Sequence, residues 1–274
     1  MTSTQAEKAR RFRDLHERAE YFIIPNPWDG MSARALEGLG FEALATSSGA
    51  IAGTLGRRDL QISREESLAN ARVIIESSDL PVSADLENGF ADDPAGVAET
   101  IARAAEVGLV GGSIEDTTGN RETPFYAFDL AVERVAAAVE VARKLPFPFL
   151  VTARAQNFVR GNPDLDDTIA RLLAFEKVGA DVLFAPGLPD LEAVRAVCQA
   201  VSKPVNYMQG IPGRSFSAAD LGAAGVKRIS LATSLYRTAM AAVIDAATEA
   251  RDRGTFSYVD AVVGERDVNR FLPK

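Results

Sequence analysis

The stretch PVSADLENGFADDPAGVAETIARAAEVGLVGGSIEDT, residues 81–117, decides the fold class of this chain. It opens with a short apolar run at Pro81–Asp85, which is typical of a strand buried on both faces. A helical pattern follows at Ala95–Val107, where acidic residues and Pro94 mark the helix start and a glycine marks its end. A second apolar run, Gly111–Glu115, completes the unit. This order predicts two parallel strands joined by a right-handed crossover.

The same unit recurs along the whole chain. Glycine turns repeatedly end a helical pattern and lead into an apolar run, as in Lys177-Val178-Gly179-Ala180-Asp181 and Ala223-Ala224-Gly225-Val226-Lys227. Eight such strands fit a closed (β/α)8 TIM-type barrel. The predicted strands are Tyr21–Pro25, Ala43–Thr46, Pro81–Asp85, Gly111–Glu115, Phe149–Ala153, Asp181–Ala185, Pro204–Tyr207 and Arg228–Leu231.

The alternative fold is a doubly wound open sheet, which often has a glycine-rich phosphate loop after its first strand. Here the first strand is followed by Asn26-Pro27-Trp28-Asp29-Gly30, which lacks that pattern. We therefore predict an α/β protein with one (β/α)8 barrel domain over residues 1–274. An N-terminal helix is expected within 1–20 and a helical segment at 234–274, with helices at Ser234–Arg253 and Tyr258–Phe271.

Composition excludes several classes of protein. The formal net charge of −8 argues against nucleic acid or an anionic membrane surface as a partner. One cysteine and one histidine exclude an intrachain disulfide, a cysteine-based metal site and a multi-histidine site. No apolar run reaches the roughly 18 residues of a membrane span. We expect a soluble protein of a reducing compartment, the cytoplasm.

Carboxylates follow the third and fourth predicted strands, at the end of the barrel where such enzymes place their chemistry. Asp85 and Glu87 are two residues apart, so on an extended strand they point to one side, and Glu115 ends the neighbouring strand. Three converging carboxylates repel one another unless a cation lies among them, and oxygen ligands favour Mg²⁺ or Mn²⁺. The alternative is that these are solvated acids or helix caps.

Other residues at strand ends suggest substrate contacts. Arg154 could grip a carboxylate with two hydrogen bonds, or form a structural salt bridge with the acids. The turn Ser47-Ser48-Gly49-Ala50 could hold an anionic oxygen, although ordinary loops share that composition. Cys198 lies in a helical pattern and is predicted to be a packing residue, and His16 is predicted to lie on a surface helix.

These motifs resemble those of the isocitrate lyase/phosphoenolpyruvate mutase superfamily over about residues 20–245. The resemblance depends on the order and spacing of several short motifs rather than on any single one. They are Asn26-Pro27-Trp28-Asp29, Ala45-Thr46-Ser47-Ser48-Gly49, Val82-Ser83-Ala84-Asp85-Leu86-Glu87-Asn88-Gly89-Phe90, Ser113-Ile114-Glu115-Asp116, Thr152-Ala153-Arg154 and Leu183-Phe184-Ala185-Pro186-Gly187.

The resemblance implies Mg²⁺ and a 2-oxo acid or its enolate as ligands. It also implies an exchange of the last barrel helix, Ser234–Arg253, between subunits of a dimer or tetramer. Asp85 matches the direct metal ligand, and Glu87 and Glu115 match the ligands that act through water. Asp59 matches the acid of a mobile loop after the second strand, unless that segment is a plain surface loop. The substrate contacts are matched by Trp28, Ser47, Ser48, Gly49, Asp85 and Arg154, and we predict Asp59, Glu115 and Arg154 as catalytic residues.

The loop after the fourth strand departs from the family. Lyases of the family have Lys-Lys/Arg-Cys-Gly-His there, whereas this chain reads Thr117-Thr118-Gly119-Asn120-Arg121-Glu122-Thr123-Pro124. Asn120 and Arg121 only loosely match the mutase loop, and we predict them as substrate contacts. We expect C–C cleavage of a small 2-oxo acid, as in an oxaloacetate decarboxylase or hydrolase. The alternatives are C–P chemistry on phosphonopyruvate, for which Arg121 or Arg160 would add positive charge, and a non-catalytic protein that binds 2-oxo acids.

Overall fold

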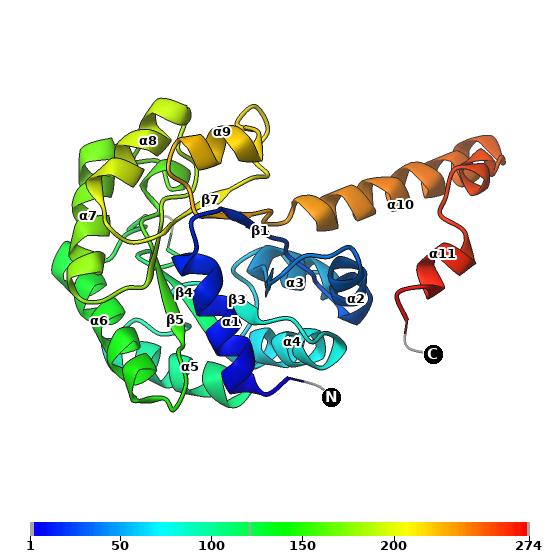
Figure 1. Ribbon diagram of the computed structural model, residues 1–274. Coiled ribbons are helices and arrows are strands. Elements are labelled where there is room, and N and C mark those ends of the chain that lie inside the picture. Colours follow the sequence, from blue (N-terminus) through cyan, green and yellow to red (C-terminus); the bar gives the residue numbers. More distant parts are fainter. Residues whose placement is uncertain (1–2, 121, 273–274) are drawn as a thin grey trace.

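The computed structural model describes residues 3–120 and 122–272, and in these residues eight parallel strands form a barrel surrounded by helices (Figure 1). Every predicted strand is present, and no strand end differs by more than one residue. The strands are β1 (Phe22–Ile24), β2 (Leu44–Ala45), β3 (Val82–Asp85), β4 (Gly111–Glu115), β5 (Leu150–Arg154), β6 (Val182–Phe184), β7 (Val205–Met208) and β8 (Arg228–Ser230).

The strand order is that of a barrel and not of a doubly wound sheet. β1 pairs with β8, and from β8 the strands follow one another in descending order to β2, so each strand lies beside its neighbour in the sequence. Between β1 and β2 the ring is bridged where the Ala45 amide donates to the Pro25 carbonyl at 3.0 Å. The register places Asp85 opposite Ser113 and Glu115 opposite Arg154. Parallel strands in this register bring the predicted site residues to one end of the barrel.

Each strand is followed by at least one helix, and most of the helices begin at a polar side chain that caps the first turn. Asp93 accepts a hydrogen bond from the Gly96 amide at 2.9 Å, and Pro94 occupies the first turn of α5, as the sequence predicts. Gly108 then takes a positive φ of 105°. The helices are α1 (Gln5–Glu17), α2 (Gly30–Gly38), α3 (Ser48–Thr54), α4 (Arg64–Ser77), α5 (Pro94–Glu106), α6 (Phe128–Lys144), α7 (Leu165–Lys177), α8 (Leu191–Ala200), α9 (Ala218–Ala223), α10 (Ser234–Arg253) and α11 (Glu265–Asn269).

Helix α1 packs against the barrel at the end opposite the predicted site, and this corrects the prediction for His16. Its imidazole is only 4% exposed and lies between the rings of Phe12 and Phe22, at centroid distances of 4.7 and 4.9 Å. Nδ1 lies 2.8 Å from the Phe12 carbonyl, and Nε2 lies 3.5 Å from the Arg228 guanidinium inside the barrel. His16 is one helical turn from Phe12, so both residues share the face that packs on the strands.

Helix α10 extends away from the barrel (Figure 1) and buries none of its own residues in the described chain. Met240, Val243 and Ile244 are exposed, the last two by 57% and 58%. Beyond α10 the predicted helix over Tyr258–Phe271 is wrong as a single element, because a short 3₁₀ turn and α11 replace it. Among the described residues no helix combines the length and the apolar character needed to span a bilayer.

Candidate active site

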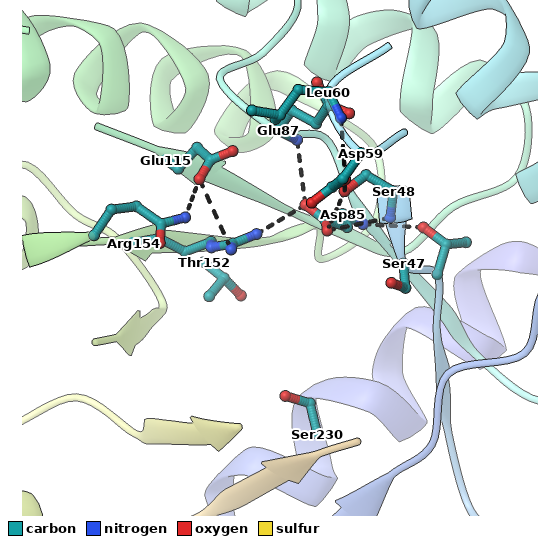
Figure 2. Close-up of polar contacts among 12 residues, drawn as sticks. Ser47, Ser48, Asp59, Leu60, Asp85, Glu87, Glu115, Thr152, Arg154 and Ser230 are labelled. Atoms are coloured by element: carbon teal, nitrogen blue, oxygen red, sulfur yellow. Dashed lines mark hydrogen bonds and ion pairs between the residues drawn. The ribbon is translucent and has the colours of Figure 1, made fainter. Parts of the chain in front are cut away.

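A cavity of about 280 Å³ opens at the carboxyl ends of the strands. Its walls come from the ends of β3 and β4 and from residues at or after the ends of β2, β5, β6, β7 and β8, so it occupies the end of the barrel that the sequence predicts. Figure 2 shows the carboxylates of Asp59, Asp85 and Glu115 converging there with the Arg154 guanidinium. The predicted residues that line this cavity are Ser47, Ser48, Gly49, Asp59, Asp85, Glu115 and Arg154.

Asp85, the last residue of β3, is the hub of the polar contacts. Its Oδ1 accepts a hydrogen bond from Arg154 at 2.8 Å. Its Oδ2 accepts from the Ser48 hydroxyl at 3.0 Å and from the Ser48 amide at 3.3 Å. The Thr46 hydroxyl fixes the Asp85 backbone by accepting its N–H at 3.0 Å. The carboxylate therefore joins the loop after β2 to the end of β5 (Figure 2).

The turn after β2 is held close to Asp59. Ser47 caps α3 by accepting from the Ala50 amide at 3.4 Å. The Ser48 hydroxyl lies 3.1 Å from the Asp59 carboxylate and shares its one proton between Asp59 and Asp85. A Cβ at Gly49 would lie 3.3 Å from the Asp59 carboxylate, which is closer than most real contacts. Asp59 thus faces the site, although its loop is exposed.

Glu87 reaches the site by a different route from the one predicted. It lies beyond the end of β3 with a positive φ of 48°, so strand alternation does not orient its side chain. Its carbonyl accepts the Glu115 amide at 2.9 Å, and this bond ties it to β4. Burial, and then the charges of Asp85, Asp59 and Glu115, together raise the pKa of the Glu87 carboxyl to about 8.

Glu115 is the most deeply buried acid of the site, at 4% exposure, and burial raises its pKa. Its Oε2 accepts a hydrogen bond from the Gln156 side chain. The guanidinium groups of Arg154 and Arg160 lie 3.8 and 3.9 Å away. Sequence reasoning did not single out Gln156, and it considered Arg160 only as an extra cation. Their positions two and six residues after Arg154 were the available signal.

The donors fit a hard divalent cation. Glu87 Oε1 is buried and has no hydrogen-bond partner among the described residues, and the Asp85 carboxylate opens into the cavity. Within residues 3–120 and 122–272, no three His, Cys, Asp or Glu side chains are close enough to form a ligand set by themselves. Carboxylate oxygens are ligands that Mg²⁺ accepts, and Mg²⁺ takes few carboxylates directly and keeps several waters.

Some predicted residues lie elsewhere. The Trp28 ring packs edge-on against Tyr236 of α10, with centroids 5.7 Å apart, and Trp28 is not among the residues that line the cavity. Asn120 is exposed, and its side chain accepts from the Glu122 amide within its own loop. Arg121 lies outside the described residues. Cys198 lies on α8, where burial raises the pKa of its thiol to about 11.

Comparisons with known proteins agree with this fold. A family model described as phosphoenolpyruvate phosphomutase matches residues 12–251. The chain belongs to this family. It therefore lies in the isocitrate lyase/phosphoenolpyruvate mutase superfamily, whose members are lyases, mutases and hydrolases acting on C–C or C–P bonds, and it is an enzyme.

Relatives in the family carry different activities. Oxaloacetate decarboxylase of Paraburkholderia xenovorans is 31% identical over 256 residues, covering 90% of this chain and 83% of the relative. A 2-methylisocitrate lyase of Halalkalibacterium halodurans is 28% identical over 205 residues, covering 74% and 67%. A solved structure from Burkholderia cenocepacia J2315, assigned as a candidate lyase/mutase, is 52% identical with a TM-score of 0.96 and covers 98% of this chain and 97% of its own.

Proposed function

We propose that this enzyme cleaves a C–C bond of a small 2-oxo acid of the oxaloacetate type, with Mg²⁺ or Mn²⁺ as its cofactor. The observation that supports this is the meeting of Asp85, Glu115, Arg154 and the Ser48 turn around one cavity. Asp85 would hold the cation directly, and Glu87 and Glu115 would hold it through water. When bound, the cation stabilises the negative charge that develops on the carbonyl oxygen.

The chain's own residues bind and orient the substrate. Arg154 has a buried Nε without a partner among the described residues, so it keeps a donor for a substrate carboxylate in addition to its bond to Asp85. Its guanidinium lies 5.1 Å from the centroid of the Phe184 ring, which limits its orientations. The Asp59 loop, joined to the site through Ser48, would exclude water as it closes.

Lyases of the family use a loop cysteine to deliver a proton, and neither the cysteine nor the histidine of this chain lies at the cavity. Cys198 is on α8, and His16 is at the opposite end of the barrel. They are the chain's one cysteine and one histidine. We therefore infer that the proton reaching the departing enolate comes from a carboxyl, a hydroxyl or water, and that cleavage of 2-methylisocitrate by the thiol route is not the reaction here.

A product assay tests this function. The purified protein with Mg²⁺ receives oxaloacetate, phosphonopyruvate and 2-methylisocitrate in parallel, and pyruvate, oxalate and phosphate are measured. Pyruvate or oxalate formed from oxaloacetate faster than in the same Mg²⁺ solution without protein supports C–C cleavage. Turnover of phosphonopyruvate alone would instead assign C–P chemistry, which a second guanidinium at the cavity, that of Arg160, could serve.

We also propose that the enzyme is a dimer or tetramer in the cytoplasm. Helix α10 buries none of its residues within one chain, and its apolar side chains Met240, Val243 and Ile244 are exposed. A partner barrel packed on this helix would bury them. Replacing Val243 and Ile244 with glutamate should give a monomer in small-angle scattering. An intact protein that is already monomeric would contradict exchange of α10.

A further inference from the structure

The loop that follows β5 presents Arg160 to the cavity on a firmly held backbone. The Arg160 amide donates to the carbonyls of Gln156 at 3.1 Å and Asn157 at 3.3 Å. Asn157 is anchored in turn, because its side chain donates to Asp167 of α7 at 2.7 Å and Asp167 pairs with Arg171 at 2.9 Å. The position of Arg160 is therefore set by the barrel body and not by the loop alone.

The Arg160 guanidinium makes no hydrogen bond to any described residue. Its Nε is buried without a partner, and its nearest acid, Glu115 Oε2, lies 3.9 Å away. That separation permits an ion pair but exceeds the length of a hydrogen bond. Glu115 Oε2 already accepts from Gln156. Arg160 thus keeps its donors while its side chain, 31% exposed, lines the cavity.

Charges alternate along one wall of the site. Asp85 contacts Arg154 at 2.8 Å, Arg154 lies 3.8 Å from Glu115, and Glu115 lies 3.9 Å from Arg160. Arg160 is the end of this row, farthest along it from the predicted metal ligand Asp85. A substrate whose 2-oxo end lies at Asp85 and Arg154 would extend its other end along this wall toward Arg160.

We propose that Arg160 binds the second anionic group of the substrate and makes the site selective for 2-oxo acids that carry an anionic group on C3. This group is a carboxylate, as in oxaloacetate, or a phosphonate, as in phosphonopyruvate. A guanidinium suits both because its planar fork meets two oxygens at once. This inference rests on the proposed binding of a 2-oxo acid, and it identifies the second anionic group as the part of the substrate that Arg160 recognises.

The test compares a short ligand with longer ones. Oxalate is also a dianion, but it presents only the oxygens of the 2-oxo acid end, whereas 3,3-difluorooxaloacetate and phosphonopyruvate carry a further anionic group on C3. Each is titrated calorimetrically in Mg²⁺ into the wild type, Arg160→Met, Arg160→Lys and the control Arg72→Met, which alters an exposed arginine of α4. Arg160→Met should bind the longer ligands about 10- to 100-fold more weakly and oxalate within about twofold. Arg160→Lys should fall between them, and Arg72→Met should match the wild type.

Each other outcome has a distinct meaning. Equal losses for oxalate and the longer ligands would show that Arg160 supports the metal end, and unchanged binding of all three would show that it touches none; either overturns the proposal. A loss for only one longer ligand supports the proposal and identifies the second group as carboxylate or phosphonate. If the wild type and the variants show the expected binding pattern but the wild type does not turn over oxaloacetate, the proposed C–C cleavage is refuted and the role of Arg160 stands. A wild type that binds no ligand refutes both proposals.

Discussion

The buried imidazole of His16 predicts a specific loss of stability in mild acid. Burial, and then the nearby Arg228 charge, lower the pKa of His16 to about 3, against an ordinary value of about 6.5. The folded protein therefore keeps the ring neutral where the unfolded chain takes up a proton. Stability from this group is complete above pH 6.5 and is lost progressively as the pH falls from 6.5 toward 3. The contact of Nε2 with Arg228 explains why the folded protein keeps the ring neutral. A protonated ring would place a positive charge against that guanidinium and would have no lone pair on Nε2 to accept its hydrogen bond.

The size of the effect follows from the pH unit between 6.5 and 5.5, over which His16 is protonated in the unfolded chain but not in the folded protein. Between pH 7.5 and 5.5 the wild type should lose about 1.4 kcal/mol of unfolding free energy through His16. Urea unfolding at both pH values measures this loss. His16→Gln is the matched variant, since its amide oxygen can accept from Arg228 but does not titrate. Other groups, including Glu87 with its raised pKa, are present in both proteins and cancel in the difference.

A direct readout also exists. The chain has one histidine, so its imidazole gives one set of NMR signals. These signals should not shift between pH 7.5 and 5.5. A titration midpoint near 6.5, or equal pH dependence of stability in the wild type and His16→Gln, would refute the reasoning.

The remaining predictions concern the site and the cysteine. Removing divalent metal with a chelator should abolish turnover and Mg²⁺ should restore it, and calorimetry should show Asp85→Ala losing more Mg²⁺ affinity than Glu87→Ala; full activity without metal would contradict this. Arg154→Lys should melt normally yet lose roughly 30- to 1000-fold in kcat/KM for oxaloacetate, because a point charge cannot replace the fork. Early melting or wild-type turnover would instead count against substrate anchoring. Cys198→Ser should keep its activity within a small factor, whereas a hundredfold loss would reveal a thiol acid in the reaction.

The sequence determined the barrel and most of the site's acids. Short apolar runs separated by capped helices leave few parallel arrangements, and parallel strands place their carboxyl ends together. Three of the site residues end consecutive strands, namely Asp85, Glu115 and Arg154. Consecutive strands are neighbours in the barrel, so their positions in the sequence are sufficient to predict that they lie together. The Ser48 turn came to the same place for the same reason, because it follows β2.

Only the tertiary structure decided what depends on contacts between distant segments. Glu87 is oriented by its own left-handed backbone conformation and by the hydrogen bond from the Glu115 amide of β4 to its carbonyl. No periodicity in the sequence encodes that turn. Arg160 is placed by the anchoring of Asn157 to α7. His16 follows the helical period of its segment, but which face of α1 is buried was settled by packing on Phe22 and Arg228, the latter more than two hundred residues along the chain. Local sequence fixes the period of a helix or strand, whereas the direction that its side chains face depends on which distant surface covers them.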